Sequence, residues 1–165
     1  QEALLNNPND ADTLNNAGQV LVELNRAPEA VSYLERAIVA RPSDHAAKFN
    51  LAVALARSGN SERAVTAYRD VIAQKPNDLR AHHNLGLVLR QLGRDDEAVQ
   101  AFQKATSLDQ DEAPAWLGLA LSLDRLNRRD EAAQAYERYV ELDPSNPEVP
   151  RMRERIGQLR RPAQV

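Results

Sequence analysis

Residues 113–146 read APAWLGLALSLDRLNRRDEAAQAYERYVELDPSN, and their pattern of residue types occurs three more times in the preceding chain, at intervals of 34 residues. An interval of this length indicates an array of repeated structural units. Four columns of the repeat return most clearly: small residues at Gly18, Ala52, Gly86 and Ala120; alanine at Ala30, Ala64, Ala98 and Ala132; leucine at Leu21, Leu55, Leu89 and Leu123; and large residues at Leu34, Tyr68, Phe102 and Tyr136.

These columns suit pairs of closely packed helices, because small residues let two helix axes approach and larger side chains fill the space beside the contact. Prolines mark the repeat ends: Pro8, Pro42, Pro76 and Pro144 lie 34, 34 and 68 residues apart, and Gln110 occupies the remaining place. We therefore divide the chain into four repeats at 11–44, 45–78, 79–112 and 113–146.

Each repeat contains two stretches of apolar residues at helical spacing, separated by a turn. The turn column holds Asn25, Gly59, Gly93 and Asn127, the residue types that best accept the left-handed cap at a helix C-terminus. Pro28 suits the first position of a helix, where no N–H donor is needed. We predict antiparallel helices at 11–24 and 28–41, 45–58 and 62–75, 79–92 and 96–109, and 113–126 and 130–143.

The two ends of the chain depart from the repeat. After Pro147 the 34-residue register stops, but Val149, Met152, Ile156 and Leu159 share one helical face, which predicts a capping helix at 147–160. Such a helix covers the apolar face of the last repeat. Residues 161–165 form a tail. Residues 1–10 read as the remnant of a preceding repeat helix, so we expect the chain to be part of a longer protein.

The composition narrows the class of function. The chain has 165 residues, a formal net charge of -3 with both signs interspersed, and no cysteine. We therefore expect no nucleic-acid partner, because no broad basic face is available to neutralise phosphates. We also expect no direct membrane insertion, because no apolar run approaches about 18 residues. A soluble protein of the cytoplasm or the periplasm fits equally well.

The repeat resembles the tetratricopeptide repeat, whose pattern the fourth copy matches at Trp116, Leu119, Ala120, Ala132, Tyr136 and Pro144. The departures are Lys48 and His82, where a bulky apolar residue is usual, and Gln110 in place of proline. The resemblance implies an all-α, right-handed α-solenoid of antiparallel helix pairs. It also implies that the first helix of each repeat lines a concave groove, which receives a peptide or a partner's helix.

Asparagine fills one column of this implied groove at Asn16, Asn50 and Asn84, and the fourth copy has Gly118 there. Asparagine is a mediocre helix former, so three copies within helices call for a reason. A primary amide can both donate to and accept from a peptide backbone, and related peptide-holding repeats use such a ladder. The alternative is that a duplicated asparagine merely bonds the neighbouring helix.

The remaining candidates for peptide binding flank this column. The apolar ones are not required by helix packing and would form an exposed interaction patch, unless curvature or the capping helix covers them. The arginines favour a ligand with a negative segment. These candidates are Asn15, Phe49, His83 and Leu117; Gln19, Val53, Leu87 and Leu121; and Arg57, Arg80 and Arg90. The carboxylate clamp of co-chaperone repeats does not match these positions, where only Asn50 is identical.

No catalytic, metal or cofactor motif is found. His45, His82 and His83 are the histidines of the chain, and neighbouring residues of a helix point about 100° apart, so His82 and His83 do not readily share one ion. Carboxylates lie beside arginines, as is typical of solvated helix faces. We therefore expect a protein that is not an enzyme, with no cofactor and no metal.

Three functional hypotheses remain. The first is a scaffold, an assembly or adaptor factor, that binds an extended peptide or a partner helix in its groove. The second is the substrate-recruiting region of a larger enzyme such as a glycosyltransferase. The third is self-association, through apolar residues near the start of the chain.

Overall fold

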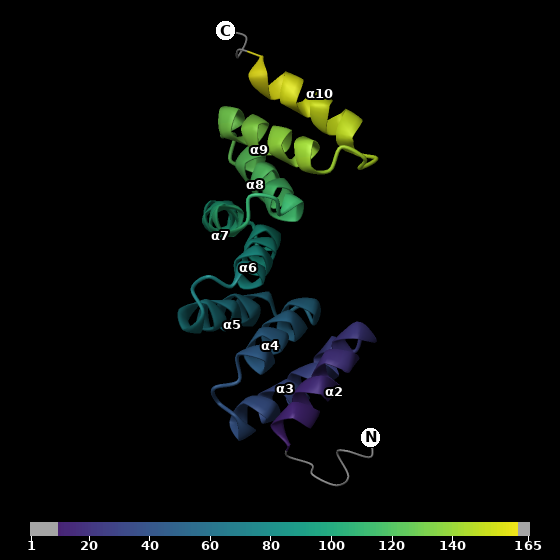
Figure 1. Cartoon of the computed structure of the whole chain (residues 1–165), viewed down its shortest axis with the longest axis vertical. Helices are drawn as coiled ribbons and strands as arrows, with labels where there is room; N and C mark the ends of the chain where they lie inside the picture. Colours follow the sequence, from purple (N-terminus) through teal and green to yellow (C-terminus); the bar gives the residue numbers. More distant parts are fainter. Residues whose placement is uncertain (1–9, 162–165) are drawn as a thin grey trace. The chain divides into compact units, whose positions relative to one another are not determined.

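The computed structural model describes residues 10–161 and is all-α over this range (Figure 1). By its internal contacts the chain divides into two compact units, unit 1 at Gln1–Val88 and unit 2 at Leu89–Val165. Among the described residues, no helix has both the length and the apolar composition needed to cross a membrane. The predicted helical remnant at 1–10 lies, except for Asp10, outside the described residues.

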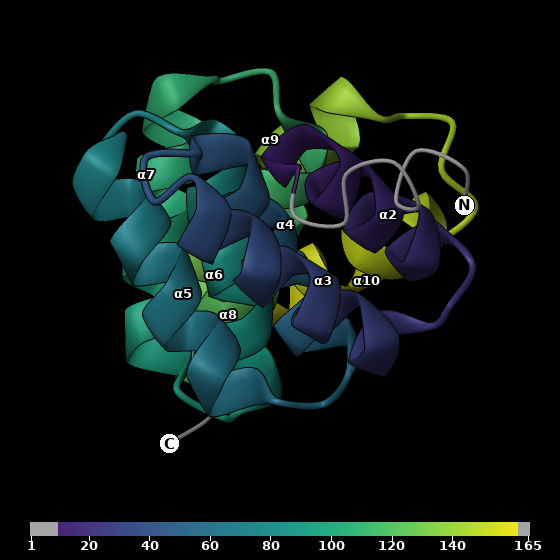
Figure 2. The same ribbon diagram turned by 90° about the horizontal axis from the view of Figure 1, so that it is seen from below.

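Unit 1 contains the first two helix pairs, and successive helices contact each other. The helix α2 (Ala11–Glu23) contacts both α3 (Ala27–Ala40) and α4 (His45–Arg57) (Figures 1 and 2). The helix α5 (Ser61–Gln74) packs on α4, and α6 (Leu79–Gln91) begins in unit 1 and ends in unit 2. The buried core of unit 1 includes Leu14, Ala30, Leu34, Ala47, Ala64, Tyr68 and Val71.

Unit 2 continues the pattern with α7 (Asp95–Leu108), α8 (Ala113–Arg125) and α9 (Arg129–Leu142), followed by α10 (Val149–Arg160). The helix α10 packs on α9, where Val149 joins the buried Tyr139 and Val140. Trp116, Leu117 and Met152 pack against the same cluster. These contacts are those of the capping helix predicted from the sequence.

The helices lie where the sequence places them, with ends that differ by one or two residues. The first helix of each pair ends one residue early, the second is shifted by one, and α10 begins at Val149 instead of 147. The helix ends were predicted closely because the turn residues were read correctly. Positive φ angles occur at all four positions of the turn column, Asn25, Gly59, Gly93 and Asn127. Behind each turn, a backbone N–H bonds the carbonyl of the leucine column, as Asn60 does to Leu55 at 2.9 Å.

The small-residue column also behaves as predicted. A Cβ atom added at Gly18 would lie 2.5 Å from Cγ of Leu34, far inside van der Waals contact, so any larger residue there would force the Leu34 side chain to shift. Ala52 and Ala120 in the same column are completely buried. The fold of antiparallel helix pairs is therefore confirmed, and its close contacts fall on the residues that the repeat pattern singles out.

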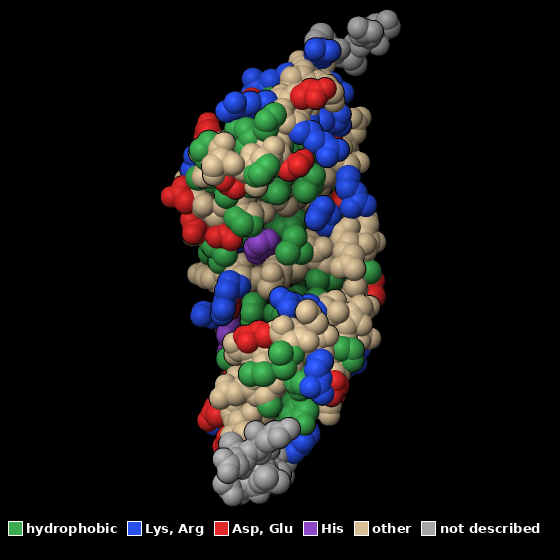
Figure 3. Space-filling model, turned by 90° about the vertical axis from the view of Figure 1, so that its right-hand side faces the viewer, with side chains coloured by type: hydrophobic (Ala, Val, Ile, Leu, Met, Phe, Trp, Pro, Cys, Tyr) green, Lys and Arg blue, Asp and Glu red, His purple; other side chains and the backbone are tan. Residues whose placement is uncertain are grey.

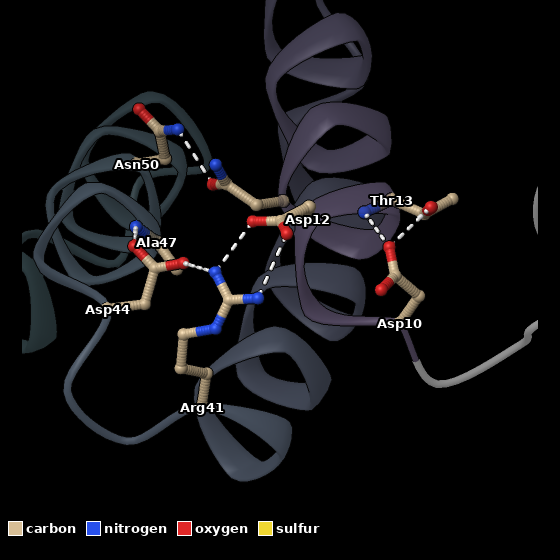
Figure 4. A network of polar contacts seen from close by, with 8 residues as sticks. Asp10, Asp12, Thr13, Arg41, Asp44, Ala47 and Asn50 are labelled. Carbon is tan, nitrogen blue, oxygen red and sulfur yellow. Dashed lines mark hydrogen bonds and ion pairs between the residues drawn. The ribbon is translucent and has the colours of Figure 1, made fainter.

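Aspartates at the same position of the repeat cap the first helix of three repeats. Asp10 accepts from the Thr13 N–H at 2.8 Å, Asp44 from Ala47 at 3.0 Å and Asp78 from Ala81 at 3.1 Å. Arg41 adds a bridge between helix starts: its guanidinium donates two hydrogen bonds to Asp12, at 2.7 and 2.9 Å, and lies 3.7 Å from Asp44 (Figure 4). This bridge links the N-terminal ends of α2 and α4 at the surface.

Candidate functional site

A hollow of about 370 Å³ lies in unit 1 between α2, α4 and the first turn of α6. The sequence predicted seven of its ten lining residues as peptide-binding. The lining consists of Asn15, Gln19, Val22 and Glu23 from α2, Ala46, Phe49, Asn50, Val53 and Arg57 from α4, and Arg80 from α6. We call this the α2–α4 hollow.

Two amides join the helices across the hollow. The Asn50 side chain donates from Nδ2 to Oδ1 of Asn15 at 2.9 Å (Figure 4). An amide has one acceptor oxygen and two N–H donors, so this bond leaves Oδ1 of Asn50 and Nδ2 of Asn15 to serve a ligand. Both residues are half-buried. The pair can therefore meet both a backbone N–H and a backbone C=O of an extended peptide.

An aromatic ring forms part of the apolar lining, but it is less open than the sequence suggested. Phe49 is only 8% exposed, because the guanidinium carbon of Arg80 lies 4.6 Å from its ring centroid. Its other neighbour is Tyr68, edge-on at 6.0 Å between centroids and 69° between planes. The expected open patch at Phe49 is thus covered by Arg80, and Val53 is the more accessible apolar residue.

The rim of the hollow carries more positive than negative charge. Arg57 and Arg80 are exposed, and Glu23 is the acidic member of the lining. Arg57 donates to the Val22 carbonyl at 3.3 Å, which ties it to the last turn of α2. Glu23 accepts from Gln19 at 3.1 Å. A ligand carboxylate would be attracted to the arginine side of this rim.

Tyr68 is buried beneath the hollow, against the ring of Phe49. Desolvation raises the pKa of the Tyr68 hydroxyl strongly, while a hydrogen bond with Asn84 and the charge of Arg57 lower it by less. Asn84 therefore bonds a helix of the preceding pair, which is the structural alternative considered for the asparagine column. Asn16 is exposed on α2 and is not part of the lining. The contact of this column with a ligand stays a prediction.

The other predicted site residues lie elsewhere. His83 is half-buried and Leu87 is 38% exposed; both belong to unit 1 but do not line the α2–α4 hollow. Arg90, Leu117 and Leu121 belong to unit 2. Arg90 accepts from Nη1 of Arg125 at 3.0 Å through its backbone carbonyl, and Leu117 packs on the cluster beneath α10. The fourteen candidates therefore do not gather in one hollow.

Three lining residues were not predicted as binding residues. Val22 and Glu23 follow Gln19 by about one helical turn, so their place on the same face could have been inferred. Ala46 shares a repeat column with Arg80, which is itself part of the lining. The repeat columns therefore contained the signal for Ala46, but its small side chain attracted no functional interpretation.

His45 and His82 make structural contacts. His45 Nε2 lies 2.9 Å from Oδ2 of Asp78, and His82 Nε2 lies 2.9 Å from the Pro76 carbonyl oxygen. Over residues 10–161, no group of three or more His, Asp or Glu side chains is placed to hold a metal ion. The first contact joins the loop before α6 to the start of α4, and the second joins the same loop to α6 itself.

Comparison with known proteins supports the repeat interpretation. A family model described as tetratricopeptide repeat matches residues 1–45, 15–78, 49–114 and 83–147, which together cover most of the chain. No curated protein matches the sequence.

Solved structures show the same fold. A crystal structure of MamA has a TM-score of 0.82 at 24% identity, over 87% of this chain and 84% of that chain. YrrB, described as a TPR protein with an unusual peptide-binding site, has a TM-score of 0.76 at 17% identity, over 96% of this chain and 91% of that chain. PilF of Pseudomonas aeruginosa has a TM-score of 0.75 at 22% identity, over 90% of this chain and 72% of that chain.

Proposed function

Because the chain belongs to the tetratricopeptide repeat family, a family of protein-interaction modules, we propose that the α2–α4 hollow binds an extended peptide of a partner protein and that the chain acts as an assembly or adaptor scaffold. The observation that carries this proposal is the Asn15–Asn50 amide pair, held beside an apolar lining and two exposed arginines. The peptide-binding site described for YrrB supports the same class of function.

The geometry suggests how the peptide is held. The free acceptor of Asn50 and the free donor of Asn15 pair with one backbone unit, whatever side chains the peptide carries. An apolar side chain of the peptide packs on Val53 and the edge of Phe49. A carboxylate approaches Arg57 and Arg80, so the arrangement favours a peptide with a negative segment.

A pull-down followed by affinity measurement tests the proposal. The wild-type chain captures a partner from lysate of the source organism, and isothermal titration then compares variants with the purified partner. We expect the Asn15→Ala, Asn50→Ala double variant to bind about 30-fold more weakly, since two hydrogen bonds of about 1 kcal/mol each are lost. Arg80→Glu should weaken binding further when the peptide segment is acidic.

Asn16→Ala is the matched comparison, because it changes the same residue type on the same helix outside the hollow. The proposal expects unchanged affinity for Asn16→Ala. Unchanged affinity for the double variant would contradict the proposal, and an equal loss with Asn16→Ala would favour the asparagine ladder along the helix column instead.

A further inference from the structure

The capping helix borders a second hollow, of about 400 Å³ and entirely within unit 2. Its lining comes from three helices and the residue before α10. The lining residues are Leu121 and Asp124 of α8, Tyr136 of α9, Glu148, and Arg151, Met152 and Arg155 of α10. We propose that this hollow binds a peptide segment of a partner protein in which a large apolar side chain stands beside an acidic residue.

The floor of this hollow is apolar. Leu121 and Met152 are half-buried, and the Tyr136 ring between α8 and α10 is buried. Methionine is flexible and polarizable, so Met152 can adapt its shape to an incoming side chain. Ligand pockets have volumes of about 300–1,000 Å³, and this one is near the lower limit. It therefore suits one large side chain.

One wall of the hollow is fastened within the protein. Arg155 donates two hydrogen bonds to Asp124, at 2.8 and 2.6 Å, and a third to Gln158 at 3.1 Å. The Tyr136 hydroxyl donates to the same Asp124 carboxylate at 3.4 Å. The polar groups of Asp124, Tyr136 and Arg155 on this wall are therefore already hydrogen-bonded to one another. A charged group of a ligand has to be recognised by the residues on the opposite side of the hollow.

Arg151 provides the available charge. Its side chain is 86% exposed, and its nearest acidic partner is Glu148, at the rather long distance of 3.6 Å. Such an exposed pair contributes little, so a ligand carboxylate can replace it at small cost. Residues 148–161 contain five arginines and two glutamates. Arg155 is paired with Asp124 and Arg160 with Glu137, which leaves Arg151 as the arginine of the lining that can meet a ligand carboxylate. Figure 3 shows Lys and Arg side chains gathered at this C-terminal end of the molecule.

Met152 also provides a direct measurement, because it is the single methionine of the chain. The 165-residue chain, prepared with a ¹³C-labelled methionine methyl group and without an initiator methionine, gives one signal from within the hollow. The probe is an array of twelve-residue peptides, each with Leu, Phe, Met or Trp flanked by glutamates. We expect at least one peptide to shift this signal saturably, while its counterpart with lysines in place of the glutamates does not.

Variants at the rim should act in opposite directions. Arg151→Gln should weaken binding about two- to five-fold, and Glu148→Gln should tighten it, because it removes both the competing partner and a like charge near the ligand. Arg153→Gln is the control, since Arg153 is exposed on the same helix outside the lining. Circular dichroism checks that each variant is folded.

No saturable shift with any peptide of the array would overturn the proposal. Equal shifts with the lysine peptides, or equal effects of Arg151→Gln and Arg153→Gln, would overturn it as well. The test is independent of the α2–α4 hollow, because the Asn15→Ala, Asn50→Ala variant leaves the unit 2 lining unaltered and should give the same titration.

Discussion

At the scale of single residues, the asparagine column shows how a repeated position depends on what faces it. Asn84 meets the hydroxyl of Tyr68, sixteen positions earlier, and bonds it. Gly118 stands sixteen positions after Phe102, which lacks a hydroxyl, and a Cβ at Gly118 would lie 2.4 Å from that ring. Asn50 follows Leu34 by the same interval; leucine has no polar side-chain atom to offer, and Asn50 bonds Asn15 instead.

Asp78 makes a residue-scale prediction about pH. It is 5% exposed. Burial raises the pKa of its carboxyl, but hydrogen bonds from His45 and the Ala81 N–H, with the charge of Arg80, outweigh burial and bring the pKa below its ordinary 3.8. A depressed pKa means that the carboxylate stabilises the folded state above about pH 3.8 and that this contribution is lost as the pH falls further.

Asparagine at this position keeps a helix cap but removes the charge. We therefore expect Asp78→Asn to lower the free energy of unfolding by about 1–2 kcal/mol at pH 7, with a smaller difference below pH 3.8. Urea unfolding of the wild-type protein and of Asp78→Asn, at pH 7 and below pH 3.8, measures this difference in the free energy of unfolding. A difference that is as large in acid as at pH 7 would show that the charge of Asp78 does not stabilise the fold.

At the scale of helices, packing and intrinsic propensity compete at glycines. Gly118 lies inside α8 against the Phe102 ring, whereas a Cβ at Gly157, inside α10, would meet nothing within 4 Å. A glycine-to-alanine change in a helix gains up to about 1 kcal/mol from propensity alone. Crowding a packed core costs about 1–3 kcal/mol. The two glycines should therefore respond to the same substitution with opposite signs.

We predict that Gly118→Ala lowers the free energy of unfolding by about 1–2 kcal/mol and that Gly157→Ala raises it by about 0.5–1 kcal/mol. Thermal and urea unfolding of the two single variants provide the measurement, each variant serving as the control for the other. Stabilisation by Gly118→Ala would mean that Phe102 shifts easily and that α7 and α8 are less tightly packed than their contacts indicate.

At the scale of the whole molecule, the contacts given within each unit join helices that are close along the chain, such as α2 with α3 and α8 with α9, as in other repeat proteins. Stability in such arrays is a sum of local terms, so damage at one end should remain near that end. The helix α10 is the clearest case, because it covers Tyr139 and Val140 through Val149 and also buries Leu159.

Truncation after Asn146 should therefore destabilise α8 and α9 by about 3 kcal/mol or more, from the loss of two buried side chains. Hydrogen exchange should become faster over 113–142 and stay unchanged over 11–40. Trp116, the single tryptophan, packs on the same cluster and should show red-shifted fluorescence. Equal acceleration over both ranges would indicate that the chain unfolds as one cooperative unit.

The fold was predicted more completely than the candidate site. The period, the helix pairs and the capped turns at Gly59 and Gly93 are confirmed, and the helix ends differ by only one or two residues. Of the fourteen predicted binding residues, Asn15, Asn50 and Arg80 are among the seven that meet in one hollow, while Asn16 is outside it and Leu121 lines another. Met152 was interpreted only as a capping residue.

The sequence by itself determined the repeat family, the all-α fold and the positions of caps and close helix contacts. These features depend on residues a few positions apart or on a constant interval, and both can be read from a linear chain. Only the tertiary structure decided that Asn50 pairs with Asn15, that Arg80 covers Phe49 and that Met152 forms the floor of a hollow. Such contacts join segments about 30 residues apart, and their geometry depends on how whole helices pack.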